Sequence, residues 1–327
     1  MYAIELNGFG GPEVMEWTVA VDPEVGPGEV LVEVVAAGVN RADVMQRKGF
    51  YPPPADASSI LGLECSGTIV ALGAGVTDWQ VGDRVCALLA GGGYAQYAAV
   101  PATQLLPVPA GMDLVAAAGL PEVAATVWSN LVLTAGLRAG QLVLIHGGGG
   151  GIGTQAIQVA RGLGARVAVT AGSDEKLAKC AELGAQILIN YRTEDFVTVL
   201  ADQGGADVIL DNMGAVYLER NVEALAPHGQ LVIIGMQGGN TGSLNIGALL
   251  RKWGTVHATN VRSRPRQGPG SKAEIIAAVR SQVWPQVAAG EIVPVISAEL
   301  PITEAARGQE LLDEAGAFGK VILKVRD

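Results

Sequence analysis

The chain has 327 residues, a length that favours two domains over one or four. Hydrophobic residues make up 49% and charged residues 17%, so the chain can bury a large core without disulfides or metals. The formal charge of −10 and the 5% of aromatic residues argue against nucleic acid as the main partner, because that binding depends on neutralised phosphates and stacked bases.

The cysteines and the N-terminal residues predict a soluble cytoplasmic protein. Cys65, Cys86 and Cys180 are odd in number and widely spaced, which is typical of neither a disulfide framework nor a zinc site. Residues 1–6 have no basic segment before an apolar run, so no signal peptide is expected. No uninterrupted apolar stretch approaches the roughly 20 residues that span a bilayer, so we expect no membrane partner.

Short β-branched runs separated by Gly and Pro dominate the first hundred residues. They predict a compact β-barrel or β-sandwich. The four clearest runs are residues 30–36, 67–72, 81–88 and 95–100. Between the first two, the proline-rich residues 50–56 cannot form a regular helix or a central strand, and we expect a stiff surface loop there.

From Pro121 to about Val261, apolar strands alternate with helical segments. Residues 142–145 are entirely apolar, as in a strand buried on both faces. Such alternation predicts βαβ units and a parallel, doubly wound sheet. The further predicted strands are residues 167–170, 187–189, 208–210 and 231–234.

The last part of the chain is too small to form a domain of its own. Residues 273–289 predict an amphipathic helix with a kink or an early end at Pro285, and residues 321–325 predict a strand. We expect this tail to pack on the first domain. The prediction is therefore a discontinuous domain, 1–121 and 264–327, interrupted by an α/β domain, 122–263.

The strongest motif is a glycine-rich turn with G-x-G-x-x-G spacing at Gly148, Gly150 and Gly153. It follows a predicted buried strand and opens a predicted helix, which is the context of a dinucleotide-binding turn. Glycines there permit a positive φ and a close approach of the backbone to a pyrophosphate at the helix N-terminus. The alternative is a mobile glycine-rich loop.

The end of the next strand bears on the choice of cofactor. An NAD site would place an acidic residue near Thr170 or Ala171, and neither is acidic. Lys176, one turn further on, can bind a 2′-phosphate through its positive charge, although it could equally cap a solvated helix face. Asp174 and Glu175 oppose the binding of a phosphate.

These motifs together resemble the zinc-free quinone oxidoreductase branch of the medium-chain dehydrogenase/reductase superfamily, and within it the stress-inducible enzymes. The resemblance covers essentially the whole chain. It implies an α/β fold in which a GroES-like β-rich catalytic domain is interrupted by a Rossmann domain. The residues that carry it are 37–49, 61–67, 82–85, the glycine turn, 172–173 and 189–191.

The sequence departs from the zinc-dependent relatives of this superfamily. Those relatives carry a Cys near the position of Asn40, a Gly-His-Glu, and a close Cys quartet. Here Leu63 replaces the His, the quartet is absent, and Cys65 has no partners at tetrahedral spacing. We therefore expect no metal, and a substrate that is already electron-poor.

By resemblance, the substrate pocket at the domain cleft includes Asn40, Tyr51 and Gln46. Asn40 can donate a hydrogen bond to a carbonyl oxygen, and Tyr51 can donate from its hydroxyl or stack on a ring. Asn40 could instead be a turn residue, Tyr51 a cover for the polyproline bend, and Gln46 part of a solvated helix face.

The resemblance also implies NADPH as the cofactor. Thr126 could instead be a core helix residue, and Arg262 could be a surface charge. The expected contacts are Thr126, Gly148, Gly150, Gly151, Ile152, Gly153, Gly172, Ser173, Lys176, Tyr191, Asn212, Gly235, Met236, Asn260 and Arg262.

The leading hypothesis is an NADPH-dependent reductase of quinones. One alternative is an enone or enoyl-thioester reductase, and another is an NADPH-binding module with little turnover. We also expect a homodimer joined through the edge strands of two Rossmann sheets. The apolar residues 231–234 and 243–246 are the candidate interface.

Overall fold

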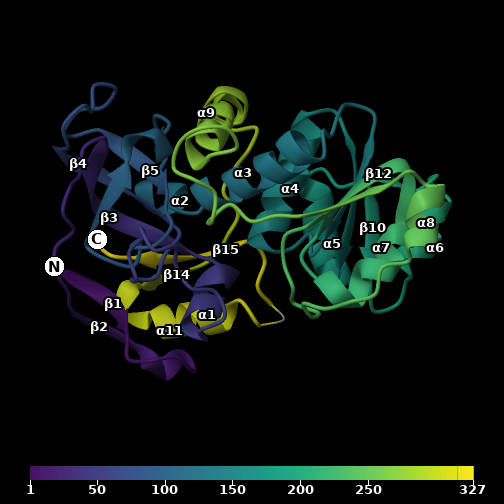
Figure 1. The fold of residues 1–327 in the computed structure, drawn as a ribbon, viewed down its shortest axis with the longest axis horizontal. Coiled ribbons are helices and arrows are strands. Elements are labelled where there is room, and N and C mark those ends of the chain that lie inside the picture. The colour runs from purple at the N-terminus through teal and green to yellow at the C-terminus, as the bar shows by residue number, and fades with distance from the viewer. Residues whose placement is uncertain (315, 327) are drawn as a thin grey trace. The chain divides into compact units, whose positions relative to one another are not determined.

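The structure, a computed structural model, describes residues 1–314 and 316–326. The chain forms two compact units (Figure 1). Unit 1 is Met1–Ala125 together with the chain from Val261 onward, and unit 2 is Thr126–Asn260. The divisions lie within a few residues of those expected from the sequence.

Unit 1 is built on a seven-stranded sheet in the order β14-β15-β3-β4-β5-β7, with β6 paired to β3, and a separate β1-β2 pair. The first half of β3 alternates between buried and half-buried side chains, the period-2 pattern of a strand with one face in a core. The strands are β1 (Tyr2–Leu6), β2 (Met15–Val19), β3 (Glu29–Val39), β4 (Glu64–Leu72), β5 (Arg84–Leu88), β6 (Tyr97–Pro101), β7 (Leu105–Pro107), β14 (Ile296–Pro301) and β15 (Lys320–Lys324).

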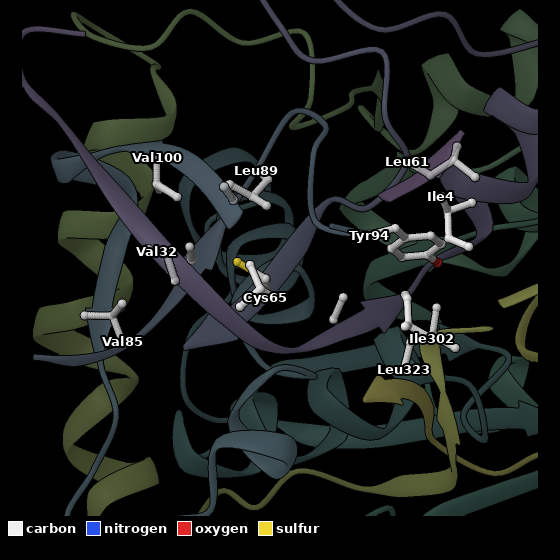
Figure 2. Close-up of a cluster of buried hydrophobic side chains, with 14 of the residues drawn as sticks. Ile4, Val32, Leu61, Cys65, Val85, Leu89, Tyr94, Val100, Ile302 and Leu323 are labelled. Carbon is white, nitrogen blue, oxygen red and sulfur yellow. The ribbon is translucent and has the colours of Figure 1, made fainter. Parts of the chain in front are cut away.

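The main core of unit 1 is a cluster of mostly aliphatic side chains with Tyr94 at one end (Figure 2). The cluster includes Ile4 from the N-terminal residues and Ile302 and Leu323 from the tail. Cys65 lies in this cluster, and Cys86 and Cys180 are also buried as free thiols. Residues from both ends of the chain therefore share one core.

The tail completes the sheet of unit 1. Strand β15 pairs antiparallel with β3, with Val321 opposite Val39. The predicted helix before it is divided at Val283 into α9 and α10, and Pro285 lies in the first turn of α10, consistent with the expected kink or early end. The helices of this unit are α1 (Arg41–Arg47), α2 (Leu114–Ala117), α9 (Lys272–Gln282), α10 (Trp284–Ala288) and α11 (Ala305–Leu311), with short 3-10 turns η1 (Pro12–Val14), η2 (Ala102–Gln104) and η5 (Ile302–Glu304).

Unit 2 contains the predicted parallel sheet, six strands in the order β10-β9-β8-β11-β12-β13. All five strand pairs are parallel, so their carboxyl ends meet at one edge. The strands are β8 (Leu142–His146), β9 (Arg166–Ala171), β10 (Ile187–Asn190), β11 (Ala206–Asp211), β12 (Leu225–Ile233) and β13 (Thr255–Ala258).

Two groups of helices cover this sheet. Helix α4 packs on α5, while α7 contacts both α6 and α8. Right-handed crossovers on either side of β8 place the two groups on opposite faces. The helices are α4 (Gly151–Gly162), α5 (Asp174–Leu183), α6 (Phe196–Ala201), α7 (Leu218–Ala224) and α8 (Ile246–Arg251), with the 3-10 turn η4 (Gly214–Tyr217).

A helical run, Leu114–Thr134, crosses the boundary between the units. It contains α3 (Pro121–Val127) and a π-helix, η3 (Trp128–Thr134). By length and composition alone this run could span a membrane, although 78% of its apolar window is buried inside the protein. The run is not one regular helix, because α2 ends at Ala117 and α3 begins at Pro121.

Candidate nucleotide and substrate sites

The glycine turn joins β8 to α4 in unit 2. All five residues of β8 are buried, as its apolar sequence predicts, and α4 begins at Gly151. Within residues 147–153 only Gly147 has a positive φ, +72°. The conformational freedom of glycine is therefore required at Gly147, and the three motif glycines do not need it.

The motif glycines instead allow close packing. A Cβ on Gly153 would collide with the carbonyl oxygen of Gly147, and one on Gly148 would lie 2.9 Å from the Cβ of Val169. A Cβ on Gly150 would meet only the Gly147 carbonyl oxygen, at 3.5 Å. The space outside Gly150 is therefore open.

This open space lies at the start of α4. The first backbone N–H groups of a helix, here those of Gly151, Ile152 and Gly153, have no acceptor within the helix. They carry partial positive charge and can bind an anion. The turn therefore fits a pyrophosphate, as expected for a dinucleotide.

The turn lies at the topological switch point of the sheet. Strand β8 has β9 on one side and β11 on the other. A Cβ on Gly147 would lie 2.9 Å from the side-chain nitrogen of Asn212, the residue after β11. Among the described residues, the buried Oδ1 of Asn212 has no hydrogen-bond partner. An unpaired acceptor beside the turn fits a ligand that supplies a hydroxyl or amide donor.

Three more residues that were predicted to contact the cofactor, Gly235, Met236 and Asn260, follow β12 and β13. A Cβ on Gly235 would lie 2.7 Å from the carbonyl oxygen of Asn212, so the segments after β11 and β12 touch. Met236 is 58% exposed, and Asn260 is two residues beyond the end of β13. These residues share the carboxyl edge of the sheet with the glycine turn, where ligands bind in such folds.

Thr126 is held by a π-helix. Its carbonyl oxygen accepts hydrogen bonds from the Asn130 side chain at 2.7 Å and the Ser129 hydroxyl at 3.2 Å. The Asn130 oxygen accepts from the hydroxyl of Thr259, just past β13. π-helical turns are rare and are frequent at functional sites. The backbone of Thr126 is thus fixed relative to the carboxyl edge of the sheet.

A buried polar chain lies under the glycine turn. The Nε2 of His146 is 2.7 Å from the Asn221 side-chain oxygen, and its Nδ1 is 3.1 Å from the Thr170 hydroxyl. An amide oxygen only accepts, so Nε2 carries the proton. Thr170 also accepts from the backbone N–H of Gly147 at 3.3 Å. Burial lowers the pKa of His146 to about 4, so this ring ties the turn to β9 and α7 in its neutral form.

The expected 2′-phosphate site gathers at the ends of β9 and β10. Ser173 caps α5 by accepting the backbone N–H of Lys176, and a Cβ on Gly172 would collide with the Tyr191 hydroxyl. Burial lowers the pKa of the Lys176 ammonium, and the charge of Arg192 lowers it further. Arg192, which sequence reasoning missed, therefore adds a second cation next to Lys176.

The two acidic residues that oppose a phosphate are engaged elsewhere. An Asp174 oxygen accepts from the Asn190 side chain at 2.7 Å. Glu175 forms an ion pair with Lys179 at 2.8 Å, one turn along α5. Their repulsion of a phosphate near Lys176 is weaker than the sequence suggests, because each carboxylate already faces a donor.

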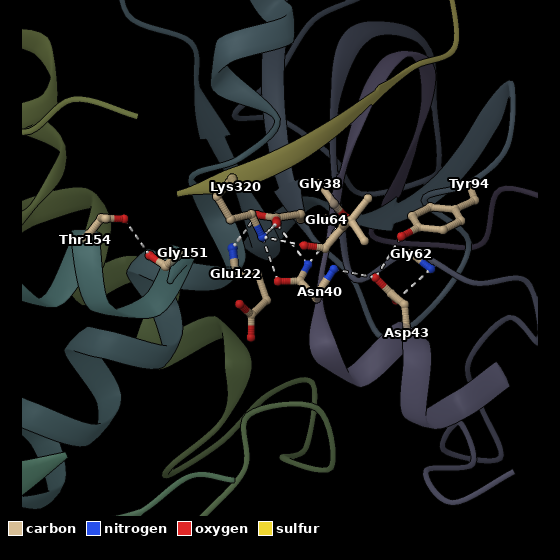
Figure 3. A network of polar contacts seen from close by, with 11 residues as sticks. Gly38, Asn40, Asp43, Gly62, Glu64, Tyr94, Glu122, Gly151, Thr154 and Lys320 are labelled. Atoms are coloured by element: carbon tan, nitrogen blue, oxygen red, sulfur yellow. Dashed lines mark hydrogen bonds and ion pairs between the residues drawn. The ribbon is translucent and has the colours of Figure 1, made fainter. Parts of the chain in front are cut away.

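In unit 1, Asn40 belongs to a buried ion-pair network (Figure 3). The Lys320 ammonium lies 2.5 Å from Oε1 of Glu64 and donates to the Asn40 side-chain oxygen at 2.7 Å. The Asn40 amide nitrogen donates to Glu64 at 2.9 Å and to the carbonyl oxygen of Gly38 at 3.4 Å. The second Glu64 oxygen accepts the backbone N–H of Glu122.

This network changes the role expected for Asn40. Both hydrogens of its amide point at acceptors within the protein, so the side chain links Lys320 to Glu64 and has no spare donor for a substrate carbonyl. Sequence reasoning missed Lys320, which lies 256 residues from Glu64. Lys320 lies one residue before the predicted strand 321–325, where no local pattern marked it.

Asp43 forms a second buried cluster beside Asn40. Its carboxylate accepts from the backbone N–H of Asn40 at 2.9 Å, that of Gly62 at 3.2 Å and the Tyr94 hydroxyl at 3.0 Å. Burial raises the pKa of Asp43 to about 6, although these donors oppose the rise. The cluster fixes the start of α1 against the core.

Tyr51, Gln46 and Arg262 come together in unit 1. Gln46 is 3% exposed, so the alternative of a solvated helix face does not hold. Its side-chain oxygen accepts from Arg262 at 2.6 Å, and Arg262 also donates to the backbone carbonyl of Tyr51 at 3.1 Å. Arg262, which was expected to contact the cofactor, thus lies outside the unit that contains the glycine turn.

The side chains near Leu63 do not fit a metal ion. Across residues 1–314 and 316–326, no group of three or more His, Cys, Asp or Glu side chains could hold one. Leu63 is buried, and burial raises the pKa of the neighbouring Cys65 thiol to about 12. That pKa opposes the thiolate form that metal ligation requires.

Two family profiles match the chain. Residues 26–110 match the alcohol dehydrogenase GroES-like domain, and residues 151–277 match the zinc-binding dehydrogenase family. The first match lies in unit 1. The second begins at Gly151, where α4 starts, covers the rest of unit 2 and extends into unit 1.

Full-length relatives narrow the family further. The quinone oxidoreductase of Pseudomonas aeruginosa is 32% identical over 326 residues, covering 98% of both chains. A 2-haloacrylate reductase from a Burkholderia species is 30% identical and also covers 98% of both. The solved structure of Escherichia coli quinone oxidoreductase complexed with NADPH gives a TM-score of 0.87 at 29% identity, covering 99% of this chain and all of that one. The chain therefore belongs to the quinone oxidoreductases of the medium-chain dehydrogenase/reductase superfamily.

Proposed function

We propose that this protein reduces quinones with NADPH and without a metal ion. The observation that carries the proposal is that one edge of the unit 2 sheet has both an open glycine turn and two neighbouring cations, Lys176 and Arg192. The family assignment supports it. The description of one matching family names zinc, but the donors around Leu63 do not fit that ion.

The residues of unit 2 would hold the cofactor. The N–H groups at the start of α4 bind its pyrophosphate, and Lys176, Arg192 and the Tyr191 hydroxyl bind its 2′-phosphate. Asn212 offers its unpaired oxygen to a donor on the ribose. NADPH supplies the hydride when it is bound.

In unit 1, Tyr51 is the proposed donor to a substrate carbonyl. Burial raises the pKa of its hydroxyl, so the group is protonated at neutral pH and can donate a hydrogen bond. The contacts that hold the Tyr51 loop use its backbone carbonyl and its ring, which leaves the hydroxyl available. Such a donor stabilises the negative charge that develops on a quinone oxygen during reduction.

Stopped-flow oxidation of NADPH tests this function. We expect rapid oxidation with 1,4-benzoquinone, in the presence of EDTA, and a slow rate without an acceptor. Activity that EDTA abolishes and zinc restores would refute the metal-free part. Oxidation without any acceptor dependence would refute quinone reduction.

A second candidate is the reduction of electron-poor double bonds. The similarity to a protein named 2-haloacrylate reductase favours it, because 2-haloacrylate is itself an electron-poor alkene. This reaction also requires a proton delivered to carbon, for which Tyr51 is the candidate donor. Faster turnover of trans-2-hexenal than of benzoquinone would select this function over the first.

Replacement of Gly150 by valine should weaken cofactor binding without unfolding the protein. Gly150 has φ −81° and ψ 170°, which any residue adopts, and the space beyond it is open. The valine side chain would occupy the position of the pyrophosphate. We expect the NADPH Kd to rise at least about tenfold, or roughly 1.4 kcal/mol, as measured by fluorescence titration.

Gly153→Ala is the contrasting variant for this test. Its Cβ would collide with the Gly147 carbonyl, so we expect lower thermal stability as well as weaker binding. Unchanged NADPH affinity in folded Gly150→Val would place the pyrophosphate elsewhere.

Lys176→Ala should lose affinity for NADPH and retain affinity for NADH. A hydrogen bond to a charged group contributes about 1.5–3 kcal/mol, which corresponds to roughly ten- to a hundredfold in Kd. Lys179→Ala is the comparison variant on α5: it frees the Glu175 carboxylate, so we expect a smaller loss of NADPH affinity than in Lys176→Ala and no change in NADH affinity. An equal loss for both cofactors in Lys176→Ala would show that this lysine acts on the fold or on the pyrophosphate.

We also propose a homodimer through β13, one of the two edge strands of the unit 2 sheet. The expected contribution of residues 231–234 does not hold for the part within β12, because β12 is paired on both sides. Ile246, Leu250 and Trp253, each more than two-thirds exposed, form an apolar surface on and after α8. Light scattering should find a dimer in wild type and a monomer in Leu250→Glu, and a monomeric wild type would end this proposal.

A further inference from the structure

Arg262 binds three separate segments of unit 1. Its Nε donates to the carbonyl oxygen of Ala90 at 2.8 Å, its Nη1 to that of Tyr51 at 3.1 Å, and its Nη2 to the side-chain oxygen of Gln46 at 2.6 Å. The residue is 5% exposed. A planar guanidinium with three acceptors in different directions is fixed in one orientation.

The same guanidinium lies over the ring of Tyr51. Its Cζ is 5.2 Å from the ring centroid, within the range of a cation–π contact. One side chain therefore holds both the backbone and the ring of Tyr51. Burial raises the pKa of the Tyr51 hydroxyl, and the charge of Arg262 counteracts that rise.

Further bonds keep this arrangement in place. The Gln46 amide donates to the carbonyl oxygen of Ser59 at 2.8 Å, which secures the far end of the proline-rich loop. The backbone carbonyl of Arg262 accepts from the buried Lys272 ammonium at 2.9 Å. Both ends of the loop from Tyr51 to Ser59 are thus tied to the pair formed by Gln46 and Arg262.

We propose that Arg262 is a positioning residue that holds the Tyr51 hydroxyl where a substrate carbonyl can reach it. This inference rests on the proposed function, in which Tyr51 is the donor. It replaces the expectation from the sequence that Arg262 contacts the cofactor, because each of the three nitrogens of this guanidinium already donates to an acceptor in unit 1.

A double-mutant cycle tests whether Arg262 acts through Tyr51. We expect Arg262→Met and Tyr51→Phe each to lower kcat for benzoquinone at least tenfold, and the double variant to be no slower than the slower single variant. The NADPH Kd of Arg262→Met should stay within twofold of wild type. Losses in kcat that multiply in the double variant, or a tenfold weaker NADPH Kd, would overturn the proposal.

Arg326→Met is the matched control. Arg326 also lies over a tyrosine ring, 5.0 Å from the centroid of Tyr97, and donates to two backbone carbonyls, those of Val34 at 3.2 Å and Gln96 at 3.3 Å. The Arg326→Met substitution removes a similar set of contacts from the same unit without touching the Tyr51 loop. Its kcat should match wild type, whereas Arg262→Lys, which keeps the charge, should recover part of the kcat lost in Arg262→Met.

Hydrogen exchange of a peptide covering residues 45–60 separates this proposal from the proposed function. We expect at least tenfold faster exchange in Arg262→Met and no change in Arg326→Met. If wild type fails to reduce any quinone while this difference appears, the proposed function fails and the positioning of Tyr51 stands. Unchanged exchange in Arg262→Met would overturn the positioning role whatever the activity.

Discussion

Lys320→Met should destabilise the protein by about 3–5 kcal/mol, because removal of one partner of a buried ion pair leaves the other charge unpaired. Glu64 is fully buried and Lys320 is 5% exposed. The methionine would leave the Glu64 carboxylate with neutral donors only, from Asn40 and the backbone of Glu122. Urea unfolding monitored by tryptophan fluorescence measures the loss.

Two variants make this prediction specific. Glu64→Gln combined with Lys320→Met removes both charges, and we expect it to be more stable than Lys320→Met alone. Lys324→Met, on the same strand, breaks an exposed pair with Glu299 and should cost no more than about 1 kcal/mol. A Lys320→Met protein as stable as the Lys324→Met protein would contradict the assignment of a buried pair.

Acid should remove about 3 kcal/mol of stability through His146 alone between pH 7 and pH 4. Burial lowers the pKa of this ring from its ordinary 6.5 to about 4 in the folded protein. The unfolded chain therefore takes up a proton in this window while the folded protein does not. The stabilising contribution is complete above pH 6.5 and is lost as the pH falls toward 4.

Comparison with His146→Gln isolates this effect. Burial raises the pKa of Asp43 and Asp211 to about 6, and these carboxyls act in the opposite sense, adding stability as the pH falls. The stability of the wild-type protein reflects the sum of the pH-dependent contributions of His146, Asp43 and Asp211. The His146→Gln variant lacks only the contribution of the histidine. The difference in unfolding free energy between the two proteins should therefore shrink by about 3 kcal/mol from pH 7 to pH 4, and a difference independent of pH would contradict the buried neutral ring.

The elements that the sequence predicts well are those specified by local pattern. Four of the five residues of β8 are apolar and all five are buried, and Pro285, which lacks a backbone N–H, lies in the first turn of a new helix, α10. The glycine spacing predicted the turn, although Gly148 and Gly153 act by close packing, Gly150 faces open space, and only Gly147 has a positive φ. In these cases the physical cause lies within a few residues.

The features that the sequence did not predict depend on contacts between distant residues. Lys320 is part of the Asn40 network only because β15 pairs with β3. Strand β13, and not β12, lies at an edge of the unit 2 sheet. This follows from the strand order, which no local sequence pattern specifies. Arg192 joins Lys176 because β10 lies beside β9.

The pairing of β15 with β3 also sets the order of events during synthesis. Strand β3 is made near the start of the chain and β15 near its end, so the ribosome completes every residue of unit 2 before that strand pair can form. Until then Glu64 has no ammonium partner, and residues 36–39 of β3 lack the strand that pairs with them. Unit 2 can therefore fold before unit 1 is complete, and during that interval the open segment of β3 is exposed to pairing with other chains.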